Sequence, residues 1–252
     1  MEMEMAQRTD PAQEPRTPLS RERVLRAAIV LVDEAGIEAL TMRRLGQELQ
    51  VEAMSLYNHV ADKDDILDGL ADLVFSEIAV PSDPADWKTA MRQRAISARD
   101  ALLRHPWAPS LMLSRARPGP ATLRHHDSVI GSLRAAGFTL VMAAHAISVI
   151  DGYIYGFVQQ EINLLLHTPE QVAEVGEAML EQLAGEYPHL AEMITDHAMQ
   201  PGYAYSEEFD FGLDLILDGL ERLRAARRRT LTRRQTRADK STSTRRSADS
   251  VR

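Results

Sequence analysis

Four polar side chains gather in the segment 53–60, where the residue pattern predicts a short helix. In such a helix Leu56 and Val60 lie on the apolar face. The opposite face then carries side chains that hydrogen-bond to base edges or phosphates: Ser55, Tyr57, Asn58 and His59. Cations suited to phosphate contacts flank this face: Arg43, Arg44 and Lys63. The chemistry indicated is binding to nucleic acid, although many helical hairpins share this pattern.

The elements that must position these side chains have clear start and stop signals. Ser20 and Gly36 are placed to cap the two ends of a first helix, and Thr41 caps a second helix over 42–49. A turn over 50–52 leads to the helix over 53–60, and Asp62 and Asp65 occupy the N-cap and N3 positions of a fourth helix that runs to about Val80. An apolar underside would hold the two short helices together: Leu45, Leu49, Val51, Leu56 and Val60. This is the outline of a helix-turn-helix.

The remaining sequence is also predicted to be helical, so the fold class is all-α. Residues 1–18 contain three prolines and are interpreted as a flexible arm, residues 19–80 as the first domain, and residues 228–252 as a disordered basic tail. Pro81 and Pro84 mark the boundary to a second domain over 81–227. Its helices are expected over 86–104, 121–136, 139–165, after Pro169 and over 206–227. The segment around 105–120 is expected to be irregular, and 186–205 to be a loop that contains a helical piece.

Composition and charge exclude several classes of protein. The 252 residues contain no cysteine, which rules out a disulfide scaffold, a Cys-ligated zinc finger and a thiol nucleophile. The formal net charge is −8, but residues 222–252 hold twelve Lys/Arg and only two Asp/Glu. Residues 19–65 hold six Lys/Arg and nine Asp/Glu. A small module that contacts DNA fits these numbers better than a protein that wraps nucleic acid over its whole surface. The Arg-rich tail either contacts phosphates or serves solubility.

The long apolar segment 138–158 is interpreted as a helix of a bundle rather than a membrane span. Its length would suffice to cross a bilayer, but Asp151 near its centre would cost about 2.5–3.5 kcal/mol there. Small residues recur along it and would let another helix approach closely: Ala144, Ser148, Gly152 and Gly156. Because the first 18 residues resemble no secretory signal, the expected location is the cytoplasm, with no membrane partner.

The segment LTMRRLGQELQVEAMSLYNHVADKDDIL, residues 40–67, resembles the DNA-binding signature of the tetracycline-repressor (TetR) family. Residues 134–158 and 207–223 are similar to helices of the tetracycline repressor's own subclass. The resemblance implies an N-terminal three-helix helix-turn-helix domain and a C-terminal helical domain for ligand binding and dimerisation. It also implies DNA contacts at nine positions: Arg43, Arg44, Ala53, Met54, Ser55, Tyr57, Asn58, His59 and Lys63.

Two positions depart from the family's pattern. Ala53 and Met54 form an apolar pair that suits thymine methyl groups rather than a bidentate contact to adenine, so a different operator is expected. Gln50 stands at a turn where the family usually has Gly, and a positive φ at a non-Gly residue costs roughly 1 kcal/mol.

The resemblance further implies a homodimer, a palindromic operator and a small-molecule effector that binds within the second domain. Residues proposed to line the effector cavity are Asp151, Tyr155 and Gln159, at successive turns of one helix, with His105 and Trp107 as further candidates. The alternative for Asp151, Tyr155 and Gln159 is a buried polar role at a bundle interface. Gln160 replaces an acid of the tetracycline site, so the effector is not expected to be tetracycline, and neither a cofactor nor a metal is predicted.

Two alternatives from other classes remain. A small all-helical enzyme would need a nucleophile–base pair, paired carboxylates or a metal cluster, and the sequence contains neither a Gly-rich phosphate loop nor an HExxH motif. A regulator that responds only to a protein partner would lack an enclosed cavity. The favoured interpretation is a DNA-binding transcriptional regulator, a homodimeric repressor that a small molecule releases from its operator.

Overall fold

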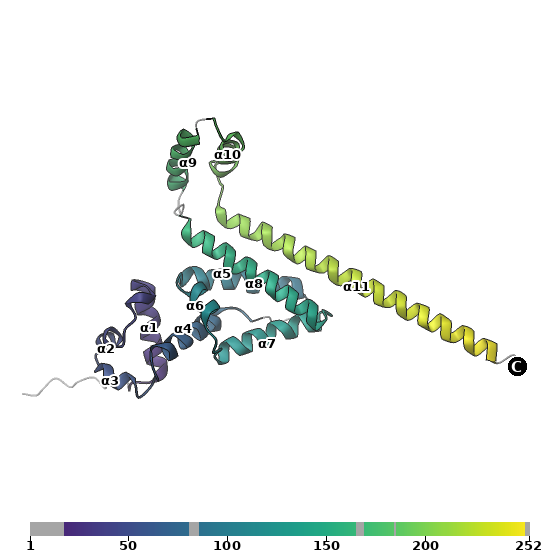
Figure 1. The fold of residues 1–252 in the computed structure, drawn as a ribbon, viewed down its shortest axis with the longest axis horizontal. Helices are drawn as coiled ribbons and strands as arrows, with labels where there is room; N and C mark the ends of the chain where they lie inside the picture. Colours follow the sequence, from purple (N-terminus) through teal and green to yellow (C-terminus); the bar gives the residue numbers. More distant parts are fainter. Residues whose placement is uncertain (1–17, 81–85, 165–168, 184, 250–252) are drawn as a thin grey trace, which may run out of the picture. The chain divides into compact units, whose positions relative to one another are not determined.

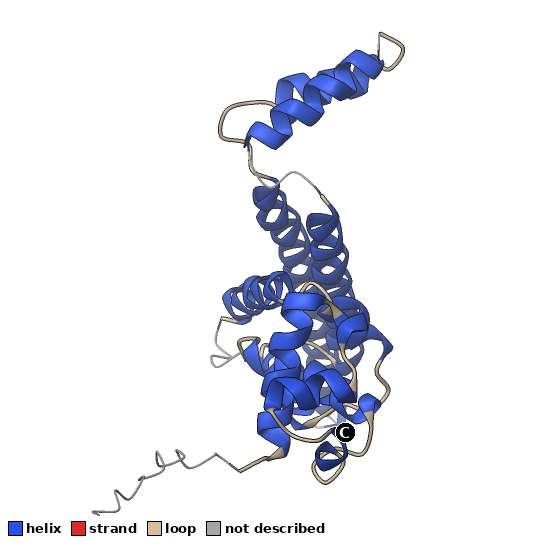
Figure 2. Ribbon diagram, turned by 90° about the vertical axis from the view of Figure 1, so that its left-hand side faces the viewer, coloured by secondary structure: helices blue, strands red, loops and turns tan. Residues whose placement is uncertain are grey.

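The structure is a computed structural model that describes residues 18–80, 86–164, 169–183 and 185–249. Throughout these ranges the regular elements are helices and none is a strand, which confirms the predicted all-α class (Figure 2). The chain divides into two compact units, residues 1–70 and residues 71–252. The proposed flexible arm lies outside the described residues except for Pro18.

The first unit begins with α1 (Arg21–Ala35), whose two ends are capped as the sequence predicts. The Ser20 hydroxyl accepts a hydrogen bond from the Arg23 amide at 3.2 Å, and Gly36 follows the last turn with φ 79°. A short 3₁₀ turn, η1 (Ile37–Ala39), leads to α2 (Met42–Leu49), where the Thr41 hydroxyl accepts from the Arg44 amide. The capping residues therefore fix where both helices begin.

The fourth helix, α4 (Lys63–Glu77), starts with a reciprocal cap. The Asp62 carboxylate accepts from the Asp65 amide at 2.8 Å, and the Asp65 carboxylate accepts from the Ala61 amide at 3.0 Å. Asp65 also pairs with Arg21 at 2.6 Å, which ties the start of α4 to α1. These contacts give the acidic run at 62–65 a structural role.

The two units divide within α4, between Leu70 and Ala71, rather than at the predicted boundary. The prolines of that boundary belong to residues 81–85, outside the described residues. The second half of α4 belongs to the second unit because its carboxylates bind there. Asp72 caps α7 (Pro120–Ala135) by accepting from the Ala121 and Thr122 amides at 3.2 and 2.8 Å and from the Thr122 hydroxyl at 2.9 Å.

The second unit is built around α8 (Leu140–Asn163), which packs against α5 (Trp87–Arg104), α7 and α11 (Tyr205–Asp249). Helices α8 and α11 run side by side (Figure 1). Among the described helices, α8 alone is long and apolar enough to cross a membrane, by length and composition. Its packing against three helices agrees with the prediction of a bundle helix.

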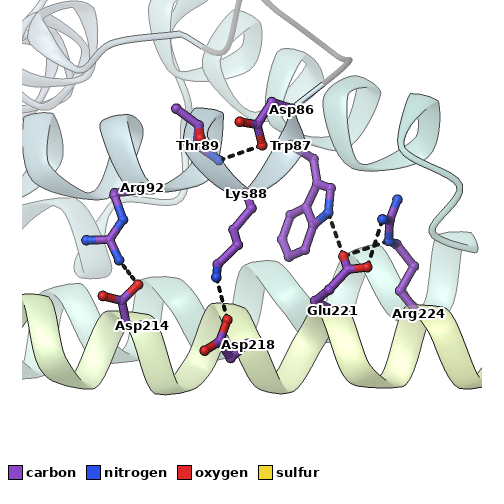
Figure 3. A network of polar contacts seen from close by, with 9 residues as sticks. All are labelled: Asp86, Trp87, Lys88, Thr89, Arg92, Asp214, Asp218, Glu221 and Arg224. Carbon is purple, nitrogen blue, oxygen red and sulfur yellow. Dashed lines mark hydrogen bonds and ion pairs between the residues drawn. The ribbon is translucent and has the colours of Figure 1, made fainter.

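Helix α11 lies along α5 and is fastened to it by polar contacts (Figure 3). Lys88 and Arg92 of α5 pair with Asp218 and Asp214 of α11. The Trp87 indole N–H donates to the Glu221 carboxylate at 3.0 Å, and the same carboxylate pairs with Arg224. This ladder fixes the register of the two helices.

Two segments that were expected to be irregular contain further helices. The Pro-rich stretch after α5 forms α6 (Ala108–Ser114), which has a proline in its first turn, where the missing N–H costs nothing. After α9 (Pro169–Leu183), the segment 186–205 contains α10 (Pro188–Met193) and a π-helical turn, η2 (Ile194–Ala198), as the expectation of a helical piece in this loop allowed.

The structure describes α11 as continuing to Asp249, through a segment where disorder was expected over 228–252. The low-complexity composition suggested disorder, but the segment 221–249 contains neither Gly nor Pro and is rich in Arg and Ala, which favour helix. Nothing in this sequence therefore stops the helix that begins at Tyr205.

Candidate nucleic-acid interface and ligand cavity

The turn between α2 and α3 (Ala53–Leu56) brings the two short helices into close contact. Gln50 has φ 55° and ψ 42°, the left-handed conformation that was expected to be costly for a non-Gly residue. The Val51 amide donates to the Gly46 carbonyl at 2.9 Å. A Cβ on Gly46 would lie 2.9 Å from the Val51 oxygen and 3.2 Å from the Ala53 Cα, so only glycine fits there.

Gly46 is a positioning residue that the sequence argument missed. The available signal was a glycine inside a predicted helix, where it costs about 1 kcal/mol relative to alanine and therefore calls for a packing reason. The reason is the approach of the α3 backbone. Predicted underside residues Leu45, Leu49, Leu56 and Val60 are buried, whereas Val51 is half-buried.

The regular part of α3 is shorter than the predicted helix over 53–60, because it ends at Leu56. Residues 57–59 form a turn in which the His59 amide donates to the Leu56 carbonyl at 2.9 Å. The Val60 amide donates to the same carbonyl at 3.1 Å, so the chain still makes a full helical turn past Leu56. The polar residues 57–59 thus keep a defined backbone.

The side chains above the buried Leu56 face solvent. Tyr57 and Met54 are 46% and 74% exposed, and Asn58 is exposed as well. Three other predicted contact residues are half-buried: Ala53, Ser55 and His59. The first unit therefore presents a continuous short segment with hydrogen-bonding groups outward and leucine inward.

Five cations of the first unit fall into two groups. Arg21 and Arg26 are engaged by carboxylates of their own chain, Asp65 and Glu22. Arg43, Arg44 and Lys63 are exposed, and no carboxylate among the described residues pairs with them: Arg43 and Arg44 lie at the start of α2, and Lys63 is the first residue of α4. Two helix N-termini with uncompensated cations form a surface suited to phosphates.

A cavity of about 690 Å³ opens in the second unit. Three of the five predicted effector residues, Asp151, Tyr155 and Gln159, line it from successive turns of α8. The rest of its wall comes from α4, α6, α7 and the small residues of α8: Phe75, Pro109, Ser110, Met112, Leu113, His126, Ser148, Gly152 and Gly156. The helix spacing recognised in the sequence therefore brings these polar groups to one cavity.

The other two predicted effector residues do not line this cavity. His105 is buried, with its Nε2 atom 3.2 and 3.3 Å from the two Glu77 carboxylate oxygens, and its ring lies 5.6 Å from the Trp107 ring. Burial raises the Glu77 pKa, but hydrogen bonds from Arg104 and His105 more than offset this and leave the pKa lowered. His105 thus has a structural partner, and α6, which follows Trp107, supplies the cavity wall instead.

Behind the cavity lies a buried polar network that sequence spacing did not reveal. The Arg94 guanidinium of α5 donates from Nη2 to Asp151 Oδ1 at 2.5 Å and from Nε to His125 Nε2 at 3.0 Å. Burial, followed by the nearby Arg94 and His126, lowers the His125 pKa to about 3. His125 is therefore neutral at physiological pH and accepts the Arg94 hydrogen bond.

Adjacent histidines His125 and His126 differ in burial and in the direction of their rings. Their rings lie at 83° to each other, and each also contacts Phe75. His125 is buried, whereas His126 lines the cavity. Within the described ranges, no group of three or more His, Asp or Glu side chains could hold a metal ion.

The small-residue ridge of α8 is exposed in the single chain. A Cβ on Gly152 or Gly156 would meet nothing within 4 Å. Large apolar side chains of α8 and α11 are exposed as well, at 50–65% of their surface: Leu140, Val141, Val149, Phe211, Leu215 and Leu223. In α11, Leu217 and Leu220 are buried within the chain. The exposed apolar side chains of α8 and α11 therefore form a face on which a second copy of the chain can pack.

Two family models match the chain. Residues 24–70 match the bacterial regulatory proteins of the tetR family, and residues 80–224 match the tetracyclin repressor-like C-terminal domain. The chain therefore belongs to the TetR family. Its members are DNA-binding transcriptional regulators, and this protein is a homodimeric repressor with a ligand-binding C-terminal domain, as the sequence predicted.

Individual relatives agree with this membership. The chain is 34% identical to the HTH-type transcriptional repressor DrrR1 of Streptomyces coeruleorubidus, over 86% of this chain and 83% of that protein. It is 30% identical to the class C tetracycline repressor protein of Escherichia coli, over 82% and 92%. The Streptomyces coelicolor TetR family protein ActR, solved in complex with actinorhodin, has a TM-score of 0.67 and 25% identity, over 81% of this chain and 97% of that one.

Proposed function

We propose that the exposed face of α3 and of the turn 57–59 that follows it binds a palindromic operator in the DNA major groove. Ser55, Tyr57, Asn58 and His59 supply groups for base edges and phosphates, and Ala53 and Met54 supply apolar contacts. Arg43, Arg44 and Lys63 bind phosphates. The observation that carries this proposal is the exposed polar segment held over the buried Leu56 by the glycine contact at Gly46.

We further propose that the cavity at Asp151, Tyr155 and Gln159 is the effector site. A space of about 690 Å³ is of the size that holds a small ligand, and its presence favours a small-molecule effector over regulation by a protein partner alone. ActR was solved with actinorhodin, a small-molecule complex in a relative, and the mainly apolar wall of this cavity suits a largely apolar ligand. As a DNA-binding regulator, the protein is proposed to act in the cytoplasm and to have no catalytic role.

The test of the DNA proposal is fluorescence-anisotropy binding to short duplexes tiled across the region upstream of the gene, at two salt concentrations. Tight binding to one palindromic duplex is expected, and Tyr57→Ala should weaken it by about tenfold or more. Tyr187→Ala is the matched control because Tyr187 is similarly exposed, at 53%, but directly precedes α10 in the second unit. Equal loss in both variants would contradict the proposal.

A chain ending at Arg227 separates this site from the Arg-rich segment. The proposal expects the truncated chain to keep the sequence preference and its sensitivity to Tyr57→Ala. If weak binding is equal on every duplex and disappears with residues 228–252, the Arg-rich segment alone binds DNA and the α3 assignment is wrong.

A further inference from the structure

The cavity wall contains one charged side chain, the Asp151 carboxylate, and its charge is already compensated. Asp151 pairs with Arg94 at 2.5 Å, and the exposed fractions of the two side chains are only 17% and 4%. The carboxylate faces the cavity, whereas the guanidinium does not line it. A ligand therefore meets the negative end of a buried ion pair whose net charge is zero.

Arg94 depends on Asp151 for its neutralisation. Its Nε donates to the neutral His125, and its Nη1 is buried with no hydrogen-bond partner among the described residues. Within the same residues no second carboxylate pairs with Arg94. If Asp151 lost its charge, an unpaired guanidinium would remain buried directly behind the cavity.

The other polar groups of the wall are neutral near pH 7. Burial lowers the pKa of His126, with Asp151 and Arg94 acting in opposite directions. Burial raises the pKa of Tyr155 to about 12, and the Asp151 charge acts in the same direction. The remaining polar lining consists of hydroxyl and amide groups: Ser110, Ser148 and Gln159.

We infer that the Arg94–Asp151 pair sets the charge of the effector, with Asp151 as the specificity-determining residue. The effector is an uncharged ring compound that directs an N–H or O–H donor at Asp151. An anion would face the carboxylate at close range, and a cation would share one carboxylate with Arg94 in surroundings of low dielectric. This inference rests on the proposed effector role of the cavity.

Two fluorescent probes that differ by one sulfonate test this inference: neutral N-phenyl-1-naphthylamine and anionic 1-anilinonaphthalene-8-sulfonate. Each carries an N–H donor on a naphthalene ring. With the full chain at pH 7, the neutral probe should bind about tenfold more tightly. In Asp151→Asn, the affinity for the anionic probe should rise about tenfold, while that for the neutral probe changes much less.

Two further variants control for general effects of the substitution. Asp127→Asn makes the same change at an exposed residue of α7 that does not line the cavity, and it should leave both affinities unchanged. Arg94→Met/Asp151→Leu removes both charges and keeps similar side-chain volumes. Replacing a buried ion pair by apolar residues of similar volume is usually tolerated by the fold. The expected order of affinity for the anionic probe is Asp151→Asn, then the double variant, then the unchanged chain. Any other order overturns the inference.

A cavity-filling substitution distinguishes failure of this inference from failure of the proposed site. Ser110 is exposed and lines the cavity, so Ser110→Trp should abolish binding of the neutral probe without disturbing the core. If Ser110→Trp leaves that binding intact, the cavity is not the ligand site and both proposals fall. If Ser110→Trp abolishes binding but Asp151→Asn does not change the preference, only the inference about charge is overturned.

Discussion

The α2–α3 segment and the wall of the cavity use polar side chains in opposite ways. In the turn after α3, Tyr57 and Asn58 face solvent above the buried Leu56, and nearby cations lack carboxylate partners among the described residues. Behind the cavity wall, Arg94 and His125 are buried, and Arg94 donates hydrogen bonds to His125 and to Asp151, which lines the cavity. The unpaired cations near α3 suit a charged partner such as the DNA phosphates. The Arg94–Asp151 pair behind the cavity has no net charge and suits an uncharged ligand.

The two regions also differ in what holds them in place. A four-residue helix has little stability of its own, so α3 depends on backbone contacts around Gly46 and on its apolar underside. The cavity wall is supplied by α4, α6, α7 and α8, and behind it Arg94 of α5 pairs with Asp151 of α8. Substitutions at tight contacts should therefore affect DNA binding most, whereas the cavity should respond to changes in charge.

The largest effect is expected from Gly46→Val. The added side chain would collide with the α3 backbone, and overpacking of this kind costs about 1–3 kcal/mol, so operator affinity should fall by up to about 100-fold. Anisotropy with the operator duplex measures this loss. Gly131→Val is the matched control because a Cβ on Gly131 meets nothing within 4 Å. Similar affinities for the two variants would refute a tight α2–α3 contact.

A pH-dependent loss of stability is expected next, from His125. The folded pKa is about 3, below the ordinary value of 6.5, so the unfolded chain takes up the proton first as the pH falls. The contribution of neutral His125 is complete above pH 6.5 and is lost progressively between 6.5 and 3, by up to about 1.4 kcal/mol per pH unit.

Urea unfolding followed by tryptophan fluorescence at pH 7, 6 and 5 measures this loss, because Trp87 and Trp107 both lie in the second unit. His125→Gln retains an acceptor for Arg94 but does not titrate, so its stability should fall less over this interval. Parallel curves for the two proteins would show that His125 is not the group responsible.

Asp72→Ala should destabilise the second unit by about 1–2 kcal/mol, because the N-terminus of α7 loses the carboxylate that accepts its amides. The same fluorescence-detected unfolding measures the change. Asp127→Ala removes an exposed carboxylate from α7 and is expected to have little effect. Equal stabilities for these two variants would argue against the cap.

The smallest effect is expected from Gln50→Gly. Glycine adopts the left-handed conformation without a Cβ penalty, so the first unit should gain up to about 1 kcal/mol. Amide hydrogen exchange in α1 and α2 measures this gain locally. Slower exchange is expected, and faster exchange would show that the Gln50 side chain contributes more than its backbone strain costs.

Local signals predicted most of the fold. Ser20, Thr41 and Asp62 cap helices where the sequence placed them, because a cap depends on residues three positions apart. Two differences followed from composition: prolines concealed α6, and the low-complexity Arg-rich segment concealed the length of α11. The proline of α6 lies in its first turn, where it is tolerated, and the segment 221–249 of α11 contains neither Gly nor Pro.

The candidate site was predictable only in part, because sequence spacing reveals contacts within one helix but not contacts between residues far apart in the chain. Asp151, Tyr155 and Gln159 share a helix face, so their spacing alone brings them to one cavity. Arg94 lies 57 residues from Asp151 and 31 from His125, and no periodicity reveals such a contact. His105 and Trp107 were assigned to the cavity from their position near a break in the helix, which does not determine the direction in which a side chain points.

The most direct test of separate roles for α3 and the cavity is one experiment on the operator complex. Anisotropy follows release of the operator from the unchanged protein, Tyr57→Ala and Ser110→Trp, as compounds are added, while fluorescence follows binding of the neutral naphthylamine probe. Tyr57→Ala should weaken operator binding but still bind the probe. Ser110→Trp should still bind the operator but should neither bind the probe nor release the operator when compounds are added. Loss of both activities in either variant would contradict the assignment of two separate sites.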